Sequence, residues 1–125
     1  MAIALDHAIV RTTDRHAGAA FLAELLGLIA GEPTGPFVPV DVNADTTLDF
    51  DDRVPVGAPG HWAFRVDDAV LDAALALLAE RPGIPFGRGP GFGWDGQVDT
   101  ADGARRLYVQ DPDGHVYELF PARVP

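Results

Sequence analysis

The sequence predicts an α+β fold in which one domain, residues 1–125, contains two similar modules of about residues 1–54 and 55–125. Two observations predict it: an internal repeat, and the order of elements within each copy, which is a strand, a helix and then short strands. A chain of 125 residues suits one domain with a working hydrophobic core.

The internal repeat appears when residues 7–14 are aligned with residues 61–68. The alignment pairs His7 with His61 and Arg11 with Arg65, and it also pairs two short runs of small and apolar residues that follow. Self-similarity of this kind indicates two copies of one supersecondary unit. Each copy would leave one apolar sheet face uncovered, so the copies are expected to pair within one chain or between chains.

In the first module, apolar residues alternate from Ile3 to Val10, which predicts a strand. A helix is expected next, with Asp14 as its N-cap and Gly27 at its C-terminal end. Two short strands, Phe37–Val42 and Thr46–Asp51, complete the module.

The second module begins with a strand around His61, followed by a helix that Asp67 or Asp68 caps and that residues 81–83 end. The turn residues at 102–103 and 111–114 then separate three expected strands. These strands are Gly96–Ala101, Arg105–Gln110 and His115–Phe120.

The segment 82–96 is dense in Gly and Pro and has no counterpart in the first module. It is too broken for a helix or a central strand. We expect either a plain surface loop or the rim of a ligand cavity, in which Phe92 and Trp94 would contact the substrate.

Composition limits the classes of function. The net charge of −10 argues against a nucleic-acid partner and permits a cationic ligand, although acidic surfaces also simply keep proteins soluble. No apolar run is long enough to span a bilayer and no signal peptide is evident, so a cytoplasmic protein without a membrane partner is expected. Cysteine is absent, so a metal would have to bind His, Asp or Glu.

Three ionisable residues stand next to apolar side chains on one face of a predicted strand: His7, His61 and Glu118. A buried lone carboxylate is costly unless it is paired or binds a metal. Two His and one carboxylate on neighbouring strands would form a facial triad with open positions for water or substrate. The equivalence of the two His in the repeat supports them as ligands, whereas His16 and His115 lack that support and are expected at the surface.

The repeat also suggests a fourth group. Asp49 lies on the first-module strand that corresponds to the strand of Glu118, so it is a candidate ligand or a water-mediated neighbour of the metal. Arg11 and Arg65 share the faces of the two His, and they would either anchor a substrate carboxylate or form salt bridges at the rim.

Several segments resemble the vicinal oxygen chelate superfamily, the glyoxalase, bleomycin-resistance and extradiol dioxygenase group. They are residues 5–7, 21–28 and 60–66 and, most specifically, Asp111-Pro112-Asp113-Gly114-His115-Val116-Tyr117-Glu118-Leu119. The resemblance implies paired βαβββ modules around a funnel that holds a divalent metal (Fe, Ni, Zn, Mn or Co). It also implies a homodimer and a small-molecule substrate with adjacent oxygens.

The resemblance gives three functional interpretations. A glyoxalase I pattern, our main prediction, is a metal-dependent lyase or isomerase with ligands at His7, Asp49, His61 and Glu118, where carboxylates such as Glu118 and Asp49 move a proton. This sequence departs from that pattern at Asp49, where the family usually has Glu.

The alternatives differ in chemistry. An extradiol-type dioxygenase would use His7, His61 and Glu118, with Tyr108 as a catalytic residue that contacts the substrate, but Thr100 stands near the place of the family's acid–base His. A bleomycin-type resistance protein would bind an antibiotic and needs no metal.

Overall fold

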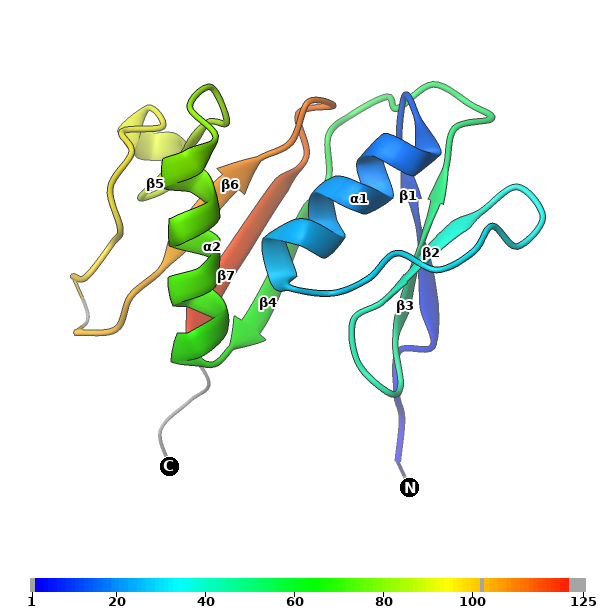
Figure 1. Ribbon diagram of the computed structural model, residues 1–125, viewed down its shortest axis with the longest axis horizontal. Helices are drawn as coiled ribbons and strands as arrows, with labels where there is room; N and C mark the ends of the chain where they lie inside the picture. Colours follow the sequence, from blue (N-terminus) through cyan, green and yellow to red (C-terminus); the bar gives the residue numbers. More distant parts are fainter. Residues whose placement is uncertain (1, 102, 122–125) are drawn as a thin grey trace. The chain divides into compact units, whose positions relative to one another are not determined.

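The computed structural model describes residues 2–101 and 103–121, which belong to two compact units, Met1–Ala58 (unit 1) and Pro59–Pro125 (unit 2). Each unit runs from a strand through a helix into further strands (Figure 1). The predicted α+β fold with two βαβββ-type modules is confirmed, although the described part of unit 1 has only two strands after its helix.

Unit 1 contains the elements β1 to β3 and one helix. The sheet order is β1-β3-β2, in which β1 pairs with β3 in parallel and β2 pairs with β3 antiparallel. The elements are β1 (His7–Arg11), α1 (Arg15–Leu26), β2 (Val38–Asp41) and β3 (Thr47–Asp51).

The ends of α1 are those that the sequence predicts. The side chain of Asp14 accepts hydrogen bonds from the backbone N–H groups of His16 and Ala17, and Gly27 ends the helix with φ 70°. The helix packs closely on its sheet because Gly18 has no side chain: a Cβ there would lie 2.6 Å from the hydroxyl oxygen of Thr12.

The predicted start of the first strand is wrong. The strand begins at His7, and Ile3 and Leu5 are 95% and 62% exposed instead of lying in a sheet face. The reason is the partner strand: β3 begins at Thr47, which lies opposite His7, and before His7 there are single hydrogen bonds to Asp6 and Leu5 instead of a strand ladder. The alternation of apolar residues in one strand does not show where its partner strand begins.

Unit 2 has a sheet of order β4-β7-β6-β5, in which β4 and β7 are parallel and the other pairs are antiparallel. Strands β4, β7 and β6 therefore repeat the arrangement of β1, β3 and β2. The elements are β4 (His61–Val66), α2 (Asp68–Glu80), β5 (Phe86–Gly87), the short 3₁₀ helix η1 (Pro90–Phe92), β6 (Leu107–Gln110) and β7 (Val116–Pro121).

The predicted strand Gly96–Ala101 is wrong. Only Asp99 makes a bridge there, to Arg106, and the fourth strand of the sheet is β5, inside the Gly- and Pro-rich segment. Two residues at a sheet edge suffice for this strand, and such a short edge strand tolerates neighbouring Gly and Pro. The density of these residues therefore excluded a central strand but not an edge strand.

One side of the unit 2 sheet is a hydrophobic core. Tyr117 is fully buried, and the ring of Trp62 lies 5.9 Å from it, with Phe64 at 6.2 Å on the same face. The helix α2 begins at the N-cap Asp67, one of the two caps that the sequence allowed. Its side chains Leu71, Ala74 and Leu78 are buried.

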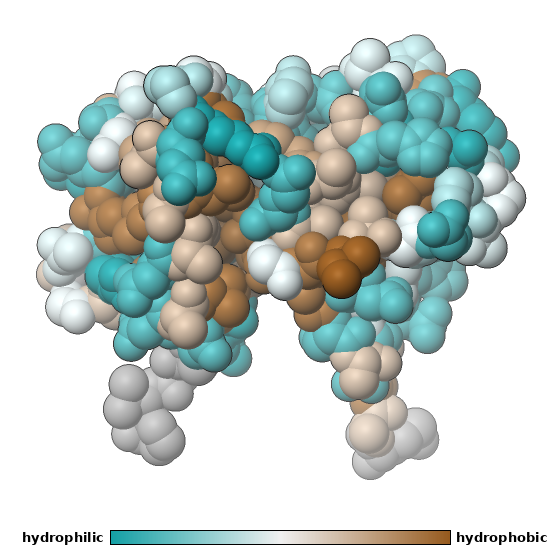
Figure 2. All heavy atoms as spheres, in the orientation of Figure 1, coloured by the Kyte–Doolittle hydropathy of each residue, from teal (hydrophilic) through white to brown (hydrophobic). Residues whose placement is uncertain are grey.

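Among the described residues, no helix is long and apolar enough to cross a membrane. The face shown in Figure 2 carries hydrophobic residues in brown among hydrophilic ones in teal in both units. Large apolar side chains that remain exposed are Ile3, Leu5, Ile9, Ile29, Val54 and Phe92.

Replacing the N-cap of α1, Asp14→Ala, is expected to lower the free energy of unfolding by about 1 kcal/mol, because two backbone N–H groups lose their acceptor. Urea unfolding of the variant beside Glu32→Ala, an exposed residue outside the elements, measures it. Equal stability of the two variants would show that the cap contributes nothing.

Candidate metal centre and substrate face

The candidate site lies on the side of the unit 2 sheet opposite its hydrophobic core. In β4 the side chains of His61, Ala63 and Arg65 are exposed, whereas the intervening Trp62 and Phe64 are half-buried. This separation of faces is the one that the sequence predicts from alternation. We call the side that carries His61, Ala63 and Arg65 the His61 face.

His61 and Glu118 come together on the His61 face. The His61 Nε2 atom lies 3.0 Å from Glu118 Oε1, and the Glu118 side chain is only 12% exposed. Their strands, β4 and β7, are parallel neighbours, and Glu118 lies opposite Ala63, two residues beyond His61. The backbone register therefore brings together two residues that are far apart in the chain.

The donor atoms of this pair suit a divalent metal ion. Two ligands that one ion holds at about 2.0–2.2 Å and at a right angle lie about 3 Å from each other. The separation of His61 Nε2 and Glu118 Oε1 is 3.0 Å, so the two atoms are already placed as neighbouring ligands would be. Imidazole nitrogen and carboxylate oxygen are also common ligands of such ions.

Tyr108 extends this constellation on β6. It lies opposite Glu118 in the sheet, and its ring meets that of His61 edge-on with centroids 6.1 Å apart. Burial raises the pKa of the Tyr108 hydroxyl, and the negative charge of Glu118 raises it further. Tyr108 therefore keeps its proton and can donate a hydrogen bond on the His61 face.

Sequence reasoning missed Arg106, which also belongs to this face. Its Nη1 atom lies 3.8 Å from Glu118 Oε2, and its positive charge opposes the rise of the Tyr108 pKa. Alternation along β6 would have found it, because residues 106, 108 and 110 point to one side. The adjacent Arg105 pairs instead with Asp68 and Asp72 of α2.

Unit 1 places His7 and Asp49 by the same register. Asp49 of β3 lies opposite Ile9, again two residues beyond the histidine that opens the parallel strand. The pKa of His7 is raised, first by the hydrogen bond and then by the charge of Asp6, and Asp49 adds a smaller contribution. A neutral His7 that donates its Nδ1 proton to Asp6, 2.7 Å away, keeps the Nε2 lone pair for another partner.

The two predicted arginines have different surroundings. Arg11 donates a hydrogen bond of 2.7 Å to the fully buried carboxylate of Asp51, which also binds the side chain and backbone of Arg53. Arg65 instead lies over the ring of Phe120, 5.7 Å from its centroid. Arg11 therefore takes part in an ion-pair network, whereas Arg65 remains exposed on the His61 face.

The segment 82–96 is held in place by an ion pair. Asp95 accepts a 2.6 Å hydrogen bond from the Nε atom of Arg88, whose guanidinium lies 4.3 Å from the ring centroid of Phe92. Phe92 is 54% exposed, and Trp94 is half-buried with a φ of 53°, an unfavourable value for its type. The segment is thus an ordered loop with an exposed aromatic ring.

The loop also reaches Tyr108. At Gly89 the backbone runs so close that an added Cβ would lie 3.3 Å from the Tyr108 ring, and its φ of 132° favours glycine. The segment 82–96 and the His61 face are therefore neighbours within unit 2.

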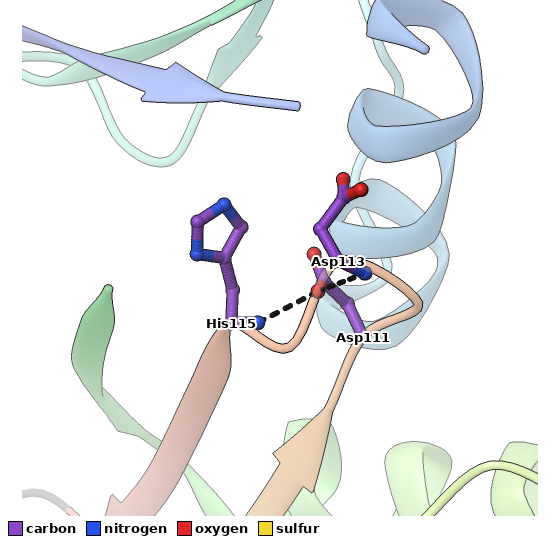
Figure 3. A group of neighbouring side chains, drawn as sticks. All are labelled: Asp111, Asp113 and His115. Carbon is purple, nitrogen blue, oxygen red and sulfur yellow. Dashed lines mark hydrogen bonds between the residues drawn. The ribbon is translucent and has the colours of Figure 1, made fainter. Parts of the chain in front are cut away.

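A second group of potential ligands lies at the turn between β6 and β7. Asp111, Asp113 and His115 offer ligand atoms that all lie within 4.8 Å of one another, so this group could hold a metal ion. In Figure 3 the carboxylate of Asp113 and the imidazole of His115 point to the same side of the turn. The prediction of a surface position for His115 is wrong, because its side chain is only 2% exposed.

Hydrogen bonds already use several of these atoms. Asp111 Oδ1 accepts from the backbone N–H groups of Asp113 and His115, which closes the turn. His115 Nδ1 accepts the backbone N–H of Gly60 at 2.9 Å, so a neutral His115 carries its proton on Nε2 and has no lone pair left for a metal. Burial raises the pKa of Asp111.

The comparisons with known proteins agree with this fold. The chain is 43% identical to the oxidase ChaP-H1 (TM-score 0.87, 98% of each chain covered) and 34% identical to the oxidase ChaP-H2 (TM-score 0.88, 98% of this chain and 96% of that one). A glyoxalase/bleomycin resistance protein from Catenulispora acidiphila shares the fold at 24% identity and a TM-score of 0.68, over 95% and 99% of the two chains. No protein-family model and no curated protein matches.

These likenesses, over nearly the whole chain, show the family. The chain belongs to the vicinal oxygen chelate superfamily, the group of glyoxalases, bleomycin resistance proteins and dioxygenases. Two of these similar proteins, at 43% and 34% identity, are oxidases, which favours the extradiol-type dioxygenase alternative over the lyase or isomerase of our main prediction.

The acid stability of unit 1 is expected to depend on Asp51. Hydrogen bonds and charge from Arg53, with the charge of Arg11, lower the pKa of this carboxyl from 3.8 to about 2. A lowered pKa stabilises the folded state above the ordinary pKa of the group, and this stabilisation is lost as the pH falls from about 4 to about 2. Asp51→Asn, which cannot titrate, should therefore lie well below the natural protein in stability at pH 6 and approach it at pH 2.

Urea unfolding of both proteins from pH 6 to pH 2 measures this effect. A difference in unfolding free energy that stays constant over the range would contradict the assignment of the ion pairs to Asp51.

Proposed function

We propose that the protein is a metal-dependent oxygenase that acts on a small organic molecule with adjacent oxygens. One observation carries the proposal: the parallel register of β4 and β7 places His61 Nε2 and Glu118 Oε1 3.0 Å apart on an exposed sheet face. The identity of 43% to an oxidase supports oxygen chemistry for this site.

His61 and Glu118 are the proposed core of the metal centre. His7 is the proposed third ligand, and Asp49 is a fourth ligand or a neighbour of the metal. Both belong to unit 1, and their inclusion rests on the internal repeat and on the shared register of the two histidines. The bond between His7 Nδ1 and Asp6 supports this role, since ligating histidines usually donate their second nitrogen to a carboxylate or carbonyl.

A redox-active divalent ion bound there would supply a Lewis-acidic centre and electrons for the reaction with oxygen. The protein contributes position and proton control. Glu118 is largely shielded from water, and Tyr108, beside it, can hold a substrate oxygen by hydrogen bonding. Thr100 stands near the place where the family has an acid–base histidine. Tyr108 is therefore the candidate proton donor of the His61 face.

The other two interpretations make different demands on the metal. A lyase or isomerase needs the ion only as a Lewis acid, so zinc, nickel or cobalt would serve it, whereas an oxygenase needs a redox-active ion such as iron or manganese. An antibiotic-binding protein would keep its ligand after the metal is removed. A cytoplasmic location and a homodimer stay predictions of the sequence.

The metal content of protein purified without chelators tests the proposal. We expect about one redox-active ion per chain and at least tenfold weaker metal binding in His61→Ala and in Glu118→Ala, because each loses a direct ligand. Asp113→Asn is the matched control, since it alters the turn group and leaves the His61 face intact.

The possible results separate the alternatives. Zinc or nickel at the His61 face would favour the lyase or isomerase. Normal metal binding in His61→Ala together with loss in Asp113→Asn would move the metal to the turn group and overturn the proposed ligands.

A further inference from the structure

The His61 face of unit 2 is a grid of three strands in which side chains form cross-strand rows. Parallel pairing of β4 with β7 and antiparallel pairing of β7 with β6 fix these rows. Arg106 precedes β6, and extending the register by one pair sets it opposite Phe120, whose ring its guanidinium approaches. The rows are His61-Val116-Gln110, Ala63-Glu118-Tyr108 and Arg65-Phe120-Arg106.

The third row concentrates positive charge. The guanidinium carbons of Arg65 and Arg106 lie 5.7 and 5.6 Å from the ring centroid of the same residue, Phe120. Arg65 is exposed, and 42% of the Arg106 side chain is exposed, so both can reach a ligand. The ring of Phe120 lies between the two arginine-bearing strands and attracts both guanidinium groups, which offsets part of the repulsion between them.

Within the described residues, Glu118 is the one carboxylate that approaches this row. Within residues 2–101 and 103–121, Arg65 has no carboxylate oxygen within 4.0 Å, and Arg106 meets only Glu118, at 3.8 Å, which is too long for a hydrogen bond. Two other arginines of unit 2 are firmly paired: Arg105 binds Asp72 at 2.6 Å, and Arg88 binds Asp95 at 2.6 Å. Surplus positive charge beside a candidate metal pair is unexpected in a chain of net charge −10.

We propose that Arg65 and Arg106 bind the carboxylate of an organic acid, which lies along the His61 face. The planar fork of a guanidinium matches a carboxylate and offers two parallel hydrogen bonds. Cationic ligands, which the overall charge permits, are disfavoured at this row by direct repulsion. This inference rests on the proposed function in one respect only: the end of the acid away from its carboxylate would lie at the proposed metal ligands.

The spacing of the rows defines the size of this acid. Phe120 lies two residues beyond Glu118, which is roughly 7 Å along the strand. An acid whose carboxylate is held by the arginines would therefore present groups roughly 7 Å away to the His61–Glu118 pair. Ala63, the smallest side chain of the middle row, leaves room between these two positions.

The inference is tested with benzoate as the probe and metal-free, chelator-treated protein, so that a metal cannot bind the carboxylate. Titration is followed by calorimetry and by the NMR signals of the arginine Nε–H groups. We expect Arg65 and Arg106 signals to shift, and roughly tenfold weaker binding in Arg65→Gln and in Arg106→Gln, as loss of one charge-assisted contact implies. Arg106→Lys should fall between them and the natural protein.

Arg105→Gln is the matched control, because Arg105 adjoins Arg106 but pairs with α2. It should bind benzoate like the natural protein even if its stability is lower. Benzyl alcohol, of similar shape without charge, should bind at least tenfold more weakly than benzoate. Equal affinity in all three glutamine variants, or equal affinity for the alcohol, would overturn the inference.

The same titration separates this inference from the proposed function. Metal binding by His61→Ala and Glu118→Ala, measured separately, reports on the metal centre alone. Benzoate binding that is lost in Arg65→Gln, together with normal metal binding in His61→Ala and Glu118→Ala, would support the arginine row and contradict the metal centre. The reverse result would leave the metal centre and remove the row.

Discussion

The parallel pairing of β4 with β7 is the constraint on which the candidate site depends. This register sets Glu118 opposite Ala63, and so brings its carboxylate within 3.0 Å of the His61 ring, which starts the neighbouring strand. Because strands are rigid and their side chains alternate, one register fixes every residue of the His61 face. A slip of one residue would turn Glu118 into the core and Tyr117 out of it, at the cost of an unpaired buried charge.

The internal repeat extends this constraint to unit 1. There, β1 and β3 repeat the parallel pairing, and Asp49 takes the place of Glu118 relative to His7. The two units differ in what surrounds these positions. Arg11 is paired with the buried Asp51, whereas the equivalent Arg65 lies over an aromatic ring and has no carboxylate oxygen within 4.0 Å among the described residues. The two units thus share the same strand register, and they differ in the side chains that surround the histidine.

Much of this could be predicted from the sequence, because the signals are local or periodic. The caps Asp14, Gly27 and Asp67, the division of β4 into two faces and the equivalence of His7 and His61 all follow from spacing and residue type. The missed features depend on partners elsewhere in the chain. β1 begins opposite the start of β3, β5 pairs with β6, and the buried His115 accepts a hydrogen bond from the Gly60 N–H. Arg106 was within reach of the alternation rule, but charge at a strand end is usually a surface feature.

A crystal structure of the protein loaded with iron or manganese, with the ion located by its anomalous scattering, tests the central claim most directly. The account predicts one ion about 2.0–2.2 Å from both His61 Nε2 and Glu118 Oε1. An ion bound by Asp111, Asp113 and His115, with His61 and Glu118 still joined only to each other, would contradict it.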